Sequence, residues 1–64
     1  MNYETVESAA KYADWLMAYD NRTPEAAVRI AAYVYRVPAG AVSAMQWQML
    51  MAACANDPSL AENI

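Results

Sequence analysis

The sequence has no histidine, one cysteine and one glycine among its 64 residues. Without histidine, the commonest general acid and base of enzyme active sites is missing. A single cysteine excludes a disulfide within the chain, and a zinc site lacks the cysteine and histidine ligands it needs. One glycine excludes a glycine-rich phosphate-binding loop. Cys54 stands between two alanines, with no basic neighbour to activate its thiol. These absences predict a protein that is not an enzyme and holds neither cofactor nor metal ion.

Positive charge is also scarce, since 4 lysines and arginines face 7 acidic residues and the net charge is −3. Nonspecific binding to nucleic acid needs basic side chains that neutralise phosphates, so this balance argues against it. No apolar run approaches the roughly 18 residues of a membrane span. Residues 1–4 carry no basic region before an apolar run, unlike a signal peptide. We therefore expect a cytoplasmic protein outside the membrane, in line with its unpaired cysteine.

Apolar residues are abundant at 59% of the chain, and many of them are alanine, the strongest helix former. A chain of this length buries only about 60% of the surface that its unfolded form exposes. With neither disulfide nor metal, stability has to come from regular helix packing or from self-association. The composition therefore predicts an all-α fold and a homodimer.

Apolar periodicity predicts a compact three-helix domain with helices at about 4–20, 23–36 and 39–55. The whole chain, 1–64, forms one domain, and residues 57–64 are either a short tail or a final helical turn. Thr23 and Pro24 are typical of a helix start, and Pro38 limits the second helix. Glu7 and Lys11 are spaced for an ion pair. The stripes expected to face the core are Val6, Ala9, Ala13, Leu16 and Met17 in the first helix, and Ala27, Ile30, Ala31, Val34 and Val37 in the second.

The third helix carries two apolar stripes on nearly opposite sides. One consists of Val42, Met45, Met49 and Ala52, and the other of Trp47, Leu50, Met51 and Cys54. A helix that is apolar nearly all round is normally buried on more than one side. Two partner helices cover only part of it, so the remainder is expected to meet a second copy or another protein.

Residues 27–48 resemble the helix-turn-helix motif of bacterial and phage regulators. The matching apolar positions are Ala32, Tyr35, Val37, Val42 and Met45. Arg36 stands where the motif usually has its turn glycine. The resemblance implies DNA recognition, with Arg29, Arg36 and either Gln46 or Gln48 at the duplex. The alternative is a helical hairpin whose small residues allow close packing, because the second helix of the motif has no basic residue.

The three arginines of the chain, Arg22, Arg29 and Arg36, are spaced seven residues apart, and Tyr33 falls between the last two. Such a stripe suits contacts with phosphates or an acidic protein surface. Alternatively it is a solvated face with local ion pairs, such as Glu25 with Arg29, or an arginine with Asp14 or Asp20.

Two groups of large apolar residues are candidates for a partner or dimer interface, because tryptophan and methionine are common in interface cores. They are Tyr12, Trp15 and Tyr19 in the first helix, and Met45, Trp47, Leu50 and Met51 in the third. We expect a small acidic protein-binding regulator or inhibitor, similar in type to phage-encoded anti-CRISPR and anti-activator proteins, that sterically covers a host protein. The alternatives are a helix-turn-helix DNA-binding transcriptional regulator and a structural dimerisation module.

Overall fold

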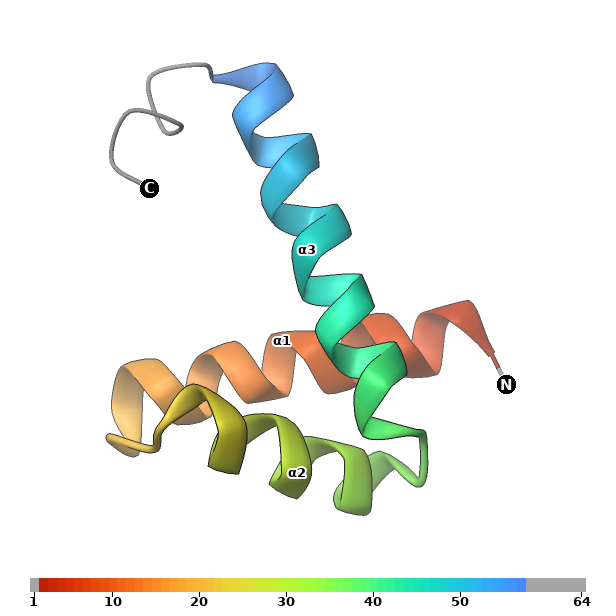
Figure 1. Cartoon of the computed structure of the whole chain (residues 1–64), viewed down its shortest axis with the longest axis vertical. Coiled ribbons are helices and arrows are strands. Elements are labelled where there is room, and N and C mark those ends of the chain that lie inside the picture. Colours follow the sequence, from red (N-terminus) through yellow and green to blue (C-terminus); the bar gives the residue numbers. More distant parts are fainter. Residues whose placement is uncertain (1, 58–64) are drawn as a thin grey trace.

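Three α-helices make up nearly all of residues 2–57, which are the residues that the computed structural model describes. They are α1 (Tyr3–Tyr19), α2 (Pro24–Tyr35) and α3 (Ala39–Asn56) (Figure 1). Each end lies within one residue of the range expected from the sequence, so the all-α three-helix prediction is confirmed. Apart from Asp57, which ends α3, the tail or final turn predicted at 57–64 lies outside the described residues.

The first two helices begin at side-chain caps. The Asn2 Oδ1 atom accepts a hydrogen bond of 2.8 Å from the backbone N–H of Glu4. The Thr23 Oγ1 atom accepts one of 3.2 Å from the N–H of Ala26, and Pro24 follows as the first helical residue. Each cap satisfies one backbone donor that the first helical turn leaves unpaired. The start of α2 is therefore specified by adjacent residues, as its sequence predicts.

Arg36 ends α2 in the left-handed backbone region, with φ 56° and ψ 48°. The N–H of Val37 donates to the carbonyl oxygen of Ala32 at 3.0 Å, and that of Arg36 donates to Tyr33 at 3.3 Å. These two bonds form a Schellman turn, in which glycine usually takes the left-handed position. The chain therefore makes the turn expected between α2 and α3 with an arginine in the position that favours glycine.

The core draws on all three helices and is built mainly from alanine. Ala13, Ala27 and Ala31 are completely buried, and such small side chains let two helices approach closely. The other buried residues are Val6, Ala9, Ala10, Leu16, Val28, Ala32, Val42 and Met45. Most of the stripe predicted for the first helix is thus confirmed, and Met17 packs at its edge.

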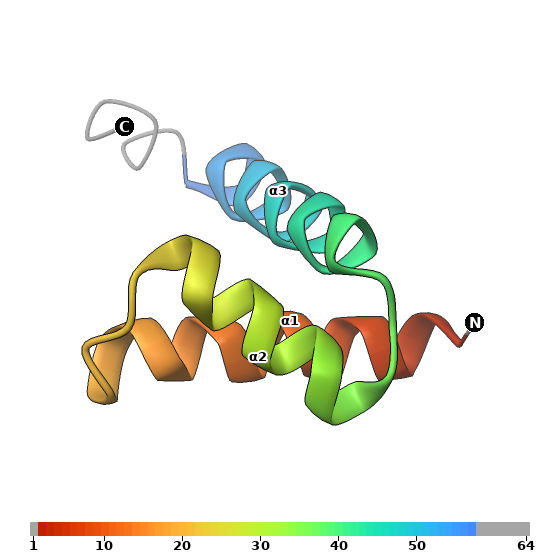
Figure 2. The ribbon, with the colours of Figure 1, turned by 60° about the horizontal axis from the view of Figure 1, so that its bottom comes forward.

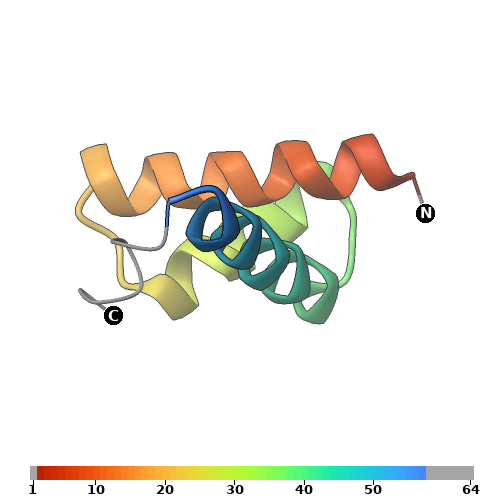
Figure 3. The same cartoon turned by 90° about the horizontal axis from the view of Figure 1, so that it is seen from above.

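The stripe predicted for the second helix is partly wrong. Val34 was expected in the core, but the structure leaves it about half exposed and buries Val28 instead. The reason is the position of α3, which lies across the α1–α2 pair (Figures 2 and 3) and packs against both helices. The side of α2 that contacts α3 therefore becomes part of the core.

Only the first half of α3 reaches that core. Val42 and Met45 are buried, and Met49 is partly buried against them. None of residues 50–56 is buried, and Figure 1 shows this end of the helix extending beyond the α1–α2 pair. We refer to residues 50–56 as the projecting half of α3.

Candidate binding surface on the third helix

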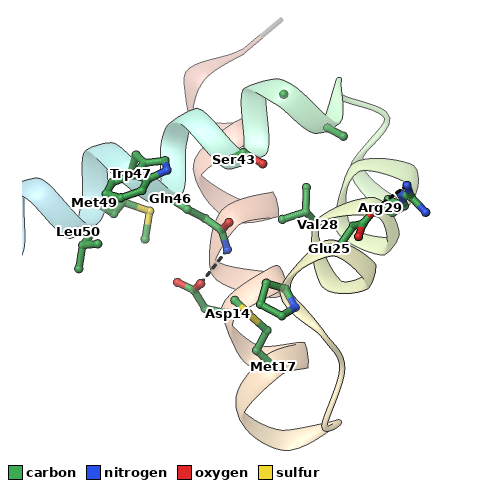
Figure 4. A pocket seen from close by; sticks show the side chains of 13 residues that line it. Asp14, Met17, Glu25, Val28, Arg29, Ser43, Gln46, Trp47, Met49 and Leu50 are labelled. Carbon is green, nitrogen blue, oxygen red and sulfur yellow. Dashed lines mark hydrogen bonds and ion pairs between the residues drawn. The ribbon is translucent and has the colours of Figure 1, made fainter. Parts of the chain in front are cut away.

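An open groove of about 850 Å³ lies between α3, the second half of α1 and the start of α2 (Figure 4). Met17 and Val28 line it from α1 and α2, and Trp47, Met49 and Leu50 line it from α3. Its walls are thus mainly apolar side chains from all three helices. The groove could not be predicted from the sequence, because its walls come from residues far apart in the chain.

Asp14 and Gln46 connect two walls of the groove. The Gln46 Nε2 atom donates a hydrogen bond of 2.9 Å to the Asp14 Oδ1 atom, and so links α3 to α1 (Figure 4). Neither side chain is buried. Gln46 was a candidate for base recognition in the helix-turn-helix interpretation. In this structure its amide is directed at a carboxylate of the same chain.

The groove has little net charge. No residue of α3 is charged, and the charged side chains that line the groove are Asp14, Glu25 and Arg29. Glu25 and Arg29 form an ion pair at 2.7 Å, so their charges offset each other. An uncharged ligand therefore suits this surface better than a strongly charged one.

Three of the predicted contact residues of the third helix are exposed. Trp47, Leu50 and Met51 have 61%, 37% and 66% of their surface accessible, and we refer to these three residues as the α3 face. Met45 was predicted with them, but the structure places it in the core at 5% exposure. It lies on the same side of α3 as Val42, where α1 and α2 cover the helix.

The predicted group on α1 forms a row of aromatic rings. The rings of Tyr12 and Trp15 are stacked at 6.1 Å, and those of Trp15 and Tyr19 lie 5.9 Å apart. Tyr12 also meets Tyr35 of α2 edge-on at 6.0 Å, a contact that the sequence analysis missed. We refer to Tyr12, Trp15 and Tyr19 as the aromatic row.

The aromatic row and the groove lie on different sides of α1. Two residues of an α-helix turn by about 200° around its axis, so Tyr12 and Asp14 point in nearly opposite directions. Tyr12 contacts α2, while Asp14 contacts α3. The structure therefore separates the two groups of predicted contact residues into two surfaces.

The arginine stripe has local partners at two of its three positions. Arg22 pairs with Asp20 at 2.8 Å, and Arg29 pairs with Glu25. Arg36 forms no ion pair within residues 2–57, and Tyr33 beside it is 85% exposed. The local pairs proposed for a solvated face are thus present, and the stripe offers less unpaired positive charge than the sequence suggests.

Within the described range, no three cysteine or acidic side chains group closely enough to hold a metal ion. No helix there has the length and hydropathy required to cross a membrane. Comparisons with known protein families, with characterised proteins and with solved structures give no match. The groove, the α3 face and the aromatic row are therefore the features of the structure that bear on function.

Proposed function

We propose that this protein acts by binding another macromolecule through the α3 face, and that it catalyses no reaction. The observation that carries this proposal is the exposure of Trp47, Leu50 and Met51 on a helix without charged residues. Burial of apolar surface stabilises a protein or a complex by roughly 25 cal/mol per Å². Apolar surface that stays in contact with water does not contribute this stabilisation. Contiguous patches of such surface on small proteins mark sites of interaction.

The residue types of the α3 face support an interface. Tryptophan and methionine are enriched in the buried centres of protein interfaces, whereas charged residues are depleted there. Methionine also adapts its shape to different partners because its side chain is flexible and polarisable. The α3 face combines both residue types, and two of its three residues, Trp47 and Leu50, also line the apolar groove.

The proposed mode of action is steric. A helical protein of 64 residues with a net charge of −3 covers a surface of a larger protein, and so regulates or inhibits it. Phage-encoded inhibitors of the anti-CRISPR and anti-activator type act in this way, and we propose that class here. The aromatic row supplies a second apolar surface on the other side of α1.

The alternative of a DNA-binding regulator has less support. The helix that would enter the major groove has no basic residue, and Gln46 is bonded to Asp14. Two of the three arginines are paired with carboxylates, although such exposed pairs are weak and open readily.

The proposal is tested by capture of a partner on the immobilised protein. The wild-type chain, Trp47→Glu and the control Tyr3→Glu are each incubated with host-cell extract, and bound proteins are identified by mass spectrometry. The control places the same charge on an aromatic position of α1 that is as exposed as Trp47 and belongs to none of the candidate surfaces. We expect the wild type and Tyr3→Glu to retain the same partner and Trp47→Glu to lose it, with unchanged circular dichroism. Equal capture by Trp47→Glu would rule out the α3 face as the binding surface.

A further inference from the structure

Within residues 2–57, neither α1 nor α2 buries the projecting half of α3. None of residues 50–56 is buried, although Leu50 and Met51 are among them. Helices shorter than about 12–15 residues are only marginally stable in water, and most helix stability in proteins comes from packing. This half of α3 is therefore a segment that gains stability when another surface covers it.

Electrostatic repulsion limits how a second copy of the chain can cover this segment. Two copies of this chain carry −3 each and repel one another unless they meet where like charges do not face each other. Both α1 and α2 expose carboxylates, whereas α3 has no charged residue. Two copies that meet through their α3 helices therefore bring no charged side chain of α3 into contact.

The groove also suits the projecting half of α3, because it offers no free charge to pair with a charged ligand. Glu25 and Arg29 are paired with each other, and Asp14 accepts a hydrogen bond from Gln46. A strongly charged segment would lose hydration on entering without gaining a free counter-charge. Residues 50–56 are uncharged and largely apolar, so they lose little.

The spacing along α3 permits two copies of the helix to pack together. Ser43, Trp47, Leu50 and Cys54 follow one another at intervals of four, three and four residues, which places them on one side of the helix. This is the spacing of the contact row between paired helices. The first three line the groove, and Cys54 continues the row into the projecting half.

The Gly40 end of the groove is open and is lined by small residues on α3. A Cβ atom built on Gly40 meets nothing within 4 Å, and Ala39 and Ser43 beside it are also small. In an antiparallel pair, the Cys54 end of one helix lies against the Gly40 end of the other. The small residues of the groove are thus opposite the segment that needs cover.

We infer that the groove receives the projecting half of α3 from a second copy of this chain, in an antiparallel dimer with two-fold symmetry. Each copy inserts its projecting half and accepts the other's, so one set of residues serves both sides of the interface. The inference rests on the proposed function, because it concerns the same α3 face: the second copy covers Trp47 and Leu50 until a larger protein displaces it. It leaves the aromatic row outside the dimer interface.

Sedimentation velocity and light scattering test the dimer between about 1 and about 200 µM, the range of moderate protein affinities. We expect the mass to rise from 7.1 kDa to twice that value. Leu50→Glu buries two charges in the dimer and should weaken association by about 100-fold or more. Tyr3→Glu, with the same change of charge on α1, should dimerise like the wild type.

Fluorescence locates the interface without introducing a charge. In Trp15→Phe, Trp47 is the remaining tryptophan, and its emission should shift to shorter wavelength as the protein concentration rises. In Trp47→Phe, Trp15 remains, and its emission should not change with concentration. The pair of variants keeps the test decisive even where Leu50→Glu disturbs folding.

A monomer over the whole concentration range overturns the inference, and so does a dimer in which Trp15 shifts and Trp47 does not. A monomer that still captures a host protein through Trp47 overturns the second copy as occupant but supports the proposed function. A monomer that captures nothing overturns both. A dimer with a shift at Trp47 supports the inference, whatever the host extract yields.

Discussion

Gln46 on α3 donates a hydrogen bond of 2.9 Å to Asp14 on α1, across 32 residues of sequence. The bond lies beside Trp47, the largest side chain of the α3 face. It joins the first half of α3, which reaches the core, to the second half of α1. We interpret it as a contact that holds α3 in the position where its groove stays open.

The Asp14–Gln46 bond should contribute modestly to stability. We expect Asp14→Ala and Gln46→Ala each to lower the free energy of unfolding by about 0.5–1.5 kcal/mol, the usual net value of one hydrogen bond. The double variant should lose less than the sum, because either change alone already breaks the bond. Urea unfolding of all four proteins measures this coupling. Strictly additive losses would show that the bond does not stabilise the fold.

Arg36 holds a backbone conformation that favours glycine, with φ 56°. The left-handed region costs a residue with a Cβ atom roughly 1–2 kcal/mol, and glycine avoids this cost. Glycine also loses more backbone entropy on folding, which offsets part of the gain in stability. Arg36→Gly should therefore raise the free energy of unfolding by about 0.5–1 kcal/mol. Arg36→Ala removes the same charge but keeps the Cβ atom, so it should give no such gain in thermal or urea unfolding. A glycine variant no more stable than the alanine variant would contradict this account of the turn.

The close contact between α1 and α2 depends on alanine. Ala13 is completely buried in the core, while Ala18 of the same helix is exposed. Ala13→Leu should destabilise the fold by about 1–3 kcal/mol or more, because the added carbons force the helices apart. Ala18→Leu should change stability by less than about 0.5 kcal/mol. Comparable unfolding midpoints for the two variants would show that the helices are not closely packed.

DNA binding is predicted to be absent or very weak. The free positive charge within the described residues is small, since Arg22 and Arg29 have carboxylate partners. Fluorescence anisotropy with random-sequence duplex DNA at low salt should show no saturable binding. Binding that weakens with added salt and with Arg36→Ala would instead favour the helix-turn-helix regulator.

Features that depend on neighbouring residues could be read from the sequence. Thr23 and Pro24 predict the start of α2, and the structure places it there because a cap uses atoms only three residues apart. The ion pairs of Glu7 with Lys11 and of Glu25 with Arg29 follow from one turn of helix. The excess of apolar residues on the third helix was also visible, and three of its four predicted contact residues, Trp47, Leu50 and Met51, are exposed.

Features that depend on contacts between helices could not be read in this way. Val28 rather than Val34 is buried on α2, and Met45 lies in the core, because α3 crosses α1 and α2 at one particular place. The same crossing creates the groove and separates it from the aromatic row. Hydrophobic periodicity shows which side chains share a side of a helix, but the position of the neighbouring helix decides which side is covered. Local sequence was thus enough for the three helices and their ends, and packing alone decided where this protein presents its apolar surface.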